Sequence, residues 1–186
     1  MIKGTGFLKV AILLNLVLLV IPLQAAWDPT QKQKDALTGA QQKTMVALEK
    51  FKAIPDLAPF FDAADGYVVF PSIAKAGIGI GGAGGQGEVF QNGKVIGKSS
   101  MKQLSIGFQF GAQAFSEIIF FKDARATDRF TAGKFEFGAQ ASAVLIKQGV
   151  AVETAFNNGI AVFTIAKGGL MYEAAIAGQK FSFNPE

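Results

Sequence analysis

From Tyr67 onward, apolar residues alternate with glycine or polar residues, and this pattern restricts the possible fold more than any other feature. Its clearest form is the segment 108–114 (FQFGAQA), which returns 27 residues later as 135–141 (FEFGAQA). Successive side chains of a strand point to opposite faces, so one face of each segment is aromatic. The repeated glycine indicates a bend or a close backbone approach, as closure of a small barrel requires. We therefore expect the aromatic positions to be core anchors: Phe108, Phe110, Phe135 and Phe137.

Turn signals divide this region into strands. Asn92-Gly93, between two apolar pairs, is the strongest hairpin signal, and Asn158-Gly159 marks another turn. The candidate strands, some of them bent or broken, are Tyr67–Phe70, Gly77–Gly82, Glu88–Gln91, Lys94–Lys98, Leu104–Ala114, Glu117–Phe121, Lys134–Lys147, Gly159–Ala166 and Leu170–Phe183. The pattern predicts a β-dominated α+β domain, with a small antiparallel β-barrel over residues 66–183 and about three helices packed outside it.

The helical section is expected over residues 30–64. Residues 30–53 have the period of an amphipathic helix, which Pro55 ends, and a short second helix reaches Phe61. A third short helix is predicted for Asp123–Thr131, with Asp123 as its N-cap and Gly133 after its end.

The first residues have the pattern of a secretory signal peptide. Lys3 and Lys9 precede the short apolar run Val10–Ile21, and small residues follow it. We expect cleavage after Ala25, which leaves residues 26–186 as a single domain. The sequence thus predicts an exported protein, periplasmic or secreted, with membrane association left open.

Residue usage argues against catalysis. The chain has no histidine and no cysteine, which removes the usual bases, thiol nucleophiles and transition-metal ligands. A Ser–Lys or paired-carboxylate site remains open, but the acidic residues are scattered and no serine is marked as activated. We expect no enzyme activity, no catalytic residue, no metal and no cofactor.

The positive charge is localised. Without Lys3 and Lys9 the chain has 16 basic and 14 acidic residues, and residues 54–186 have 11 of each. The excess lies in the predicted first helix, so we expect no nucleic-acid partner but allow a localised anionic one, such as a membrane surface. On a helical projection, Lys32, Lys43 and Lys50 line one edge of the apolar arc, and Lys34 and Lys52 line the other.

The glycine run 77–87 contains the spacing G-x-G-x-x-G. A dinucleotide site needs a helix next, whereas a strand and a turn follow here, so we reject that interpretation. Two interpretations remain: a barrel strand that ends in a loop, or a flexible loop whose backbone amides approach a phosphate. The loop glycines would be Gly82, Gly84, Gly85 and Gly87.

Two sequence blocks resemble a known family. The segments 66–77 (GYVVFPSIAKAG) and 107–113 (GFQFGAQ) resemble the SYLF, or Ysc-type, domain, as an exported bacterial member. The resemblance extends over most of residues 35–183, including 166–171 (AKGGLM). It implies a β-barrel with external helices and binding of phosphoinositides or other phospholipids, weakly in bacterial members. Actin binding belongs to eukaryotic members with further domains and is not expected here.

The sequence therefore predicts a non-enzymatic module that recognises phosphoinositide or other anionic phospholipid head groups at a membrane surface. The lysines of the first helix form one candidate site. Lys75, in the first resembling block, forms a competing site together with the glycine loop. The alternative is an outer-membrane or envelope structural protein without a specific ligand.

Overall fold

A computed structural model of the chain describes residues 38–133, 135–138, 144–145, 156–168 and 176–186. For residues 79, 105–111, 144–145 and 168 it describes the backbone alone. The elements are α2 (Gly39–Lys52), the 3-10 turn η1 (Pro55–Leu57), α3 (Ala58–Ala63), β1 (Gly66–Gln91), β2 (Lys94–Phe121), α4 (Ala124–Thr131), β3 (Phe135–Glu136), β4 (Val144–Leu145), β5 (Ile160–Gly168) and β6 (Gln179–Pro185).

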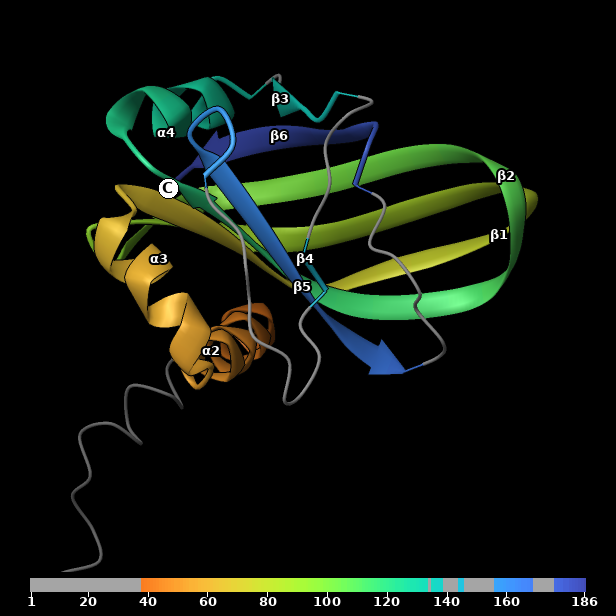
Figure 1. Cartoon of the computed structure of the whole chain (residues 1–186), viewed down its shortest axis with the longest axis horizontal. Coiled ribbons are helices and arrows are strands. Elements are labelled where there is room, and N and C mark those ends of the chain that lie inside the picture. The colour runs from red at the N-terminus through yellow and green to blue at the C-terminus, as the bar shows by residue number, and fades with distance from the viewer. Residues whose placement is uncertain (1–37, 134, 139–143, 146–155, 169–175) are drawn as a thin grey trace, which may run out of the picture. The chain divides into compact units, whose positions relative to one another are not determined.

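The strands form one curled sheet in the order β3-β6-β2-β5-β4, with β1 also paired to β2 (Figure 1). All described pairs are antiparallel except β4–β5. The three α-helices of the described residues accompany this sheet, so the predicted β-dominated α+β class is confirmed. Predicted strand positions in 146–155 and 169–175 lie outside the described residues.

One long hairpin dominates the sheet. β1 and β2 stay paired from Gly66↔Phe121 to Gln91↔Lys94, and Asn92 and Gly93 join them with φ of 51° and 73°. Both positive φ values match the predicted tight turn. The predicted breaks within each strand are wrong, because register shifts let the strands bend without losing their partner.

The hairpin folds back on itself, and glycine allows the approach. A Cβ added at Gly87 would lie 2.4 Å from the carbonyl oxygen of Val69, and one at Gly85 would lie 2.8 Å from that of Ser72. Between these contacts the strand reverses, since a Cβ at Gly77 would lie 2.3 Å from the Cα of Gly81. The two halves of β1 therefore pack closely, face to face.

The interpretation of residues 82–87 as a loop is wrong. Gly82 pairs with Leu104 and Gly87 with Ser99, so the predicted loop glycines Gly82, Gly84, Gly85 and Gly87 lie within β1. A phosphate-binding nest alternates right- and left-handed backbone conformations, whereas none of these four glycines has a positive φ. Gly85 and Gly87 serve close packing, because a side chain there would collide with the opposite half of the strand, whereas a Cβ at Gly82 or Gly84 would make only ordinary contacts.

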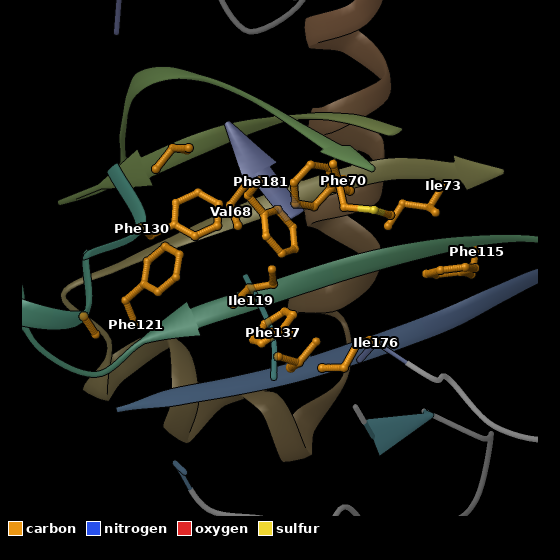
Figure 2. Packing of buried hydrophobic residues seen from close by; sticks show 14 residues of the cluster. Val68, Phe70, Ile73, Phe115, Ile119, Phe121, Phe130, Phe137, Ile176 and Phe181 are labelled. Atoms are coloured by element: carbon orange, nitrogen blue, oxygen red, sulfur yellow. The ribbon is translucent and has the colours of Figure 1, made fainter. Parts of the chain in front are cut away.

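Each face of the sheet carries its own apolar cluster. The cluster between the layers includes Phe70, Phe121, Phe130 and Phe181, as Figure 2 shows. Phe137 is buried there, and Phe135 packs against it, which confirms two of the four predicted anchors. The side chains of Phe108 and Phe110 lie outside the described residues.

The opposite face is covered by helices. Helix α2 contributes Ala47, Leu48 and Phe51 to the cluster on this face, and α3 contributes Phe60. They pack over strand residues that alternate in sequence with the strand residues of the first cluster. The strand residues are Val69, Phe90, Ile118, Phe120, Ala161 and Phe163. We call this side of the sheet the helix-covered face.

Local signals set the helix ends. Thr38 caps α2 through a reciprocal pair of hydrogen bonds with Gln41, and α2 ends at Lys52, ahead of Pro55. Asp123 caps α4 by accepting from the backbone N–H of Ala126 at 2.9 Å, and Gly133 follows with φ of 78°, as the sequence predicts. Residues 30–37 of the first predicted helix lie outside the described residues.

The folded hairpin predicts different effects for two neighbouring glycines. Gly87→Ala should destabilise the protein by about 1–3 kcal/mol, because the new methyl group meets backbone that cannot move aside. Gly84→Ala is the control, since its Cβ would lie 3.5 Å from the nearest atom, an ordinary contact. Urea denaturation measures both variants. Equal stability of the two would contradict the close approach.

Candidate functional site

An open groove of about 400 Å³ lies where α2 meets the sheet. Its lining comes from three elements: α2, β2 and β5. The lining residues are Gly39, Gln42, Lys43, Val46, Ala47, Lys50, Ser116 and Lys167. Three of the eight are lysines and none is acidic, so the groove is a cationic site by composition.

The helix positions two of these lysines together. Lys43 and Lys50 are seven residues apart, which is two turns of an α-helix, so they lie on one side of α2. Ala47, between them, is buried against the helix-covered face of the sheet. Packing of α2 therefore fixes both lysines along the boundary between helix and sheet.

The third groove lysine, Lys167, lies at a β-bulge of β5. Ala114 pairs with Gly168 and Phe115 with Ala166, so Lys167 has no partner on β2. A bulge of this kind leaves the extra residue unpaired. Ala161, Phe163 and Ile165 of the same strand all pack under the helices, and Lys167 continues this alternation at the end of the row.

The three ammonium groups repel one another. Burial and then the charges of Lys50 and Lys43 lower the pKa of Lys167 from its ordinary value. In the part of the chain that the structure describes, the ion pairs are Lys52–Glu49 (3.8 Å) and Lys180–Glu136 (3.4 Å), and neither includes a groove lysine. The groove thus concentrates positive charge that no described side chain neutralises, and an anion there relieves the repulsion.

The floor of the groove is neutral. Ser116 is buried and donates its hydroxyl hydrogen to the carbonyl oxygen of Pro71 at 2.9 Å. Val46, at the rim, has 59% of its surface exposed. The groove therefore offers cations beside an apolar surface, and lacks an activated nucleophile.

The structure separates the other predicted lysines from this groove. Lys52 lies at the opposite edge of α2, beside Glu49. Lys75 pairs with Gln113, two residues beyond the pair Ile73↔Phe115, so it shares the face of the interlayer cluster. The competing site at Lys75 is thus on the other side of the sheet. Lys32 and Lys34 lie outside the described residues.

One buried carboxyl group has a strongly shifted pKa. Burial raises the pKa of Glu117 to about 8, although the side chain of Gln179 donates a hydrogen bond to it at 3.2 Å. Such shifts often mark catalytic groups. Glu117 has no exposed surface, and the described residues contain no cluster of three or more acidic groups that could hold a metal. We interpret it as a link between β2 and β6.

Comparisons with known proteins found two similarities. The family model described as "Ysc84: Las17-binding protein actin regulator" matches residues 102–186, which include Ser116, Glu117 and Lys167. The chain is also 29% identical over 133 residues to Beta cell expansion factor A of Aeromonas veronii, covering 70% of this chain and 50% of that protein. The chain thus spans about half the length of this relative. Residues 102–186 are thus similar to the SYLF, or Ysc84-type, family.

None of the helices within the described residues is long and apolar enough to cross a membrane. This finding concerns helices alone.

The buried carboxyl group predicts a pH-dependent stability. The folded-state pKa of Glu117, about 8, exceeds the ordinary 4.5, so its contribution is complete below pH 4.5 and is lost as the pH rises towards 8. Glu117→Gln should flatten the dependence of the melting temperature on pH over this window and stabilise the protein at pH 8, by on the order of a few kcal/mol. The exposed Glu136→Gln serves as the control. A Glu117→Gln protein with the wild-type slope would contradict the assignment.

Proposed function

We propose that this protein is a non-enzymatic module that binds the anionic head groups of phospholipids, phosphoinositides among them, at a membrane surface. The observation that carries the proposal is the convergence of Lys43, Lys50 and Lys167 around one open groove, where no acidic side chain of the described residues pairs with them. The similarity of residues 102–186 to the SYLF family, which is associated with lipid binding, supports it.

The groove chemistry suits a head group. Ammonium groups donate hydrogen bonds to phosphate oxygens, and three of them match a group that carries more than one negative charge. The aliphatic stems of the lysines, with Val46 and Ala47, present an apolar surface to the glycerol region beside the phosphate. Because the groove is open to solvent, its affinity should be modest and should fall with salt.

The proposed location follows from the predicted signal peptide at residues 1–25. Outside the cytoplasm, as a periplasmic or secreted protein, the module would meet the lipids of the envelope or of another cell. We propose no actin contact for this chain.

The proposal predicts a charge-dependent loss of vesicle binding. The triple variant Lys43→Gln/Lys50→Gln/Lys167→Gln should bind anionic vesicles roughly 100-fold more weakly, since each lysine near an anionic surface contributes about 1 kcal/mol. Sedimentation with phosphatidylcholine vesicles, with and without phosphatidylglycerol, cardiolipin or phosphoinositide, measures it. The control Lys52→Gln/Lys94→Gln/Lys122→Gln removes the same charge from exposed positions elsewhere.

Three results would contradict the proposal. Equal losses in the two triple variants would show that net charge alone drives binding. Loss of binding on Lys75→Gln, with the groove variant unaffected, would move the site to the other face of the sheet. If no anionic vesicle binds at low salt, the envelope structural role takes the place of lipid binding.

A further inference from the structure

Apolar side chains project into solvent where β1 reverses direction. Ile78 and Ile80 expose 77% and 69% of their surface, and Leu104 exposes 82%. Leu104 pairs with Gly82, two residues after Ile80, so the three lie on neighbouring positions of the hairpin. We call these three residues the apolar bend. Figure 1 shows β1 and β2 curving together at the end of the sheet away from the C-terminus.

The geometry of the reversal explains the exposure. Gly77 and Gly81 come so close that no side chain fits between them, and the register shifts between Ile78 and Ile80. Side chains on the outside of so tight a turn diverge from both layers of the folded hairpin. The apolar bend contains three of the four large exposed apolar side chains of the described residues, and the fourth, Val46, lines the groove.

Along the hairpin on either side of the apolar bend, the charged side chains have one sign. Residues 71–87 and 99–116 contain two charged side chains, Lys75 and Lys102, and no acidic residue. Lys102 is exposed, and Lys75 is half-buried. Exposed aliphatic groups flanked by cations complement the surface of an anionic bilayer, where charge attracts the protein and apolar side chains enter the boundary of the acyl chains.

We propose that the apolar bend is a second membrane contact, in which Ile78, Ile80 and Leu104 insert into the interfacial region of an anionic bilayer. The inference rests on the proposed function, because it presupposes that the protein meets a membrane. The groove supplies recognition of the head group, and the apolar bend supplies a contact that salt weakens much less. Each contact is removed by its own substitutions.

The chain offers a direct test of insertion. It has a single tryptophan, so Trp27→Phe gives a silent background in which Ile78→Trp reports on the apolar bend. On anionic vesicles with brominated acyl chains, the emission of this tryptophan should be quenched and shifted to shorter wavelength. Arg125→Trp, at an exposed position of α4, is the matched control and should stay unquenched.

A second variant measures the contribution to binding. Ile78→Ser/Leu104→Ser should keep the wild-type melting temperature, since both side chains are exposed, and should bind anionic vesicles at least about tenfold more weakly at high salt. If the emission of the Ile78→Trp reporter stays unquenched while vesicle binding still requires the groove lysines, this inference is overturned and the proposed function stands. If quenching persists after the groove lysines are replaced, the groove is not the head-group site, and the apolar bend is supported as the membrane contact.

The same experiments distinguish two other partners of the apolar bend: another part of this chain and a second copy of it. If the reporter emits as a buried tryptophan without vesicles, another part of the chain covers the apolar bend, and the inference fails. If the wild type sediments as a dimer and Ile78→Ser/Leu104→Ser as a monomer with unchanged vesicle binding, the apolar bend is a contact between copies of this chain.

Discussion

The close approach of the two halves of β1 is the constraint on which the rest of the structure depends. Gly87 faces the backbone of Val69, and Gly85 faces that of Ser72, at separations that leave no room for a side chain. A strand of 26 residues would otherwise extend far beyond a domain of this size. The fold-over turns one hairpin into two layers, so that its own side chains fill the space between them.

This arrangement separates the chemistry of the two faces. Between the layers lie the phenylalanine cluster and the Glu117–Gln179 hydrogen bond, which are sealed from water. Burial of a carboxyl group favours its neutral form, so Glu117 is compatible with the core only while it keeps its proton. On the helix-covered face, α2 seals most of the sheet but leaves the lysine-lined groove beside β5 open. The lysines of the groove thus lie on the outside of the domain, where they can meet a ligand.

The sequence predicts the local elements well and the fold-over poorly. Period-two alternation and the turn at Asn92-Gly93 determine strands through neighbouring residues, and Asp123 with Gly133 determines the limits of α4 in the same way. The glycine run is different, because glycine is equally common in loops and at sites of close backbone approach. Only the long-range contact between Gly87 and Val69 decides between these interpretations, and no local pattern contains it.

The sequence predicts two of the three lysines of the candidate site. Helical spacing places Lys43 and Lys50 on one edge of α2, and the structure keeps them there. Lys167 was missed, although the sequence places it in the segment 166–171 that resembles the SYLF family. Alternation along β5 gives the face of Lys167, but its meeting with α2 depends on the pairing of β5 with β2, which is not a property of one strand alone.

The central claim is that Lys43, Lys50 and Lys167 act as one anion site, and the pKa of Lys167 tests it most directly. Reductive ¹³C-methylation makes lysine side chains visible by NMR, and loss of one signal in Lys167→Arg assigns the resonance. In the free protein, burial and then the charges of Lys50 and Lys43 lower this pKa. Glycerol phosphate, a soluble analogue of a lipid head group, should raise the pKa of Lys167 while leaving the methyl resonance of the distant Lys94 in place, because a bound anion stabilises the charged ammonium group. A pKa of Lys167 that does not move at glycerol phosphate concentrations sufficient to shift other lysines would contradict the account.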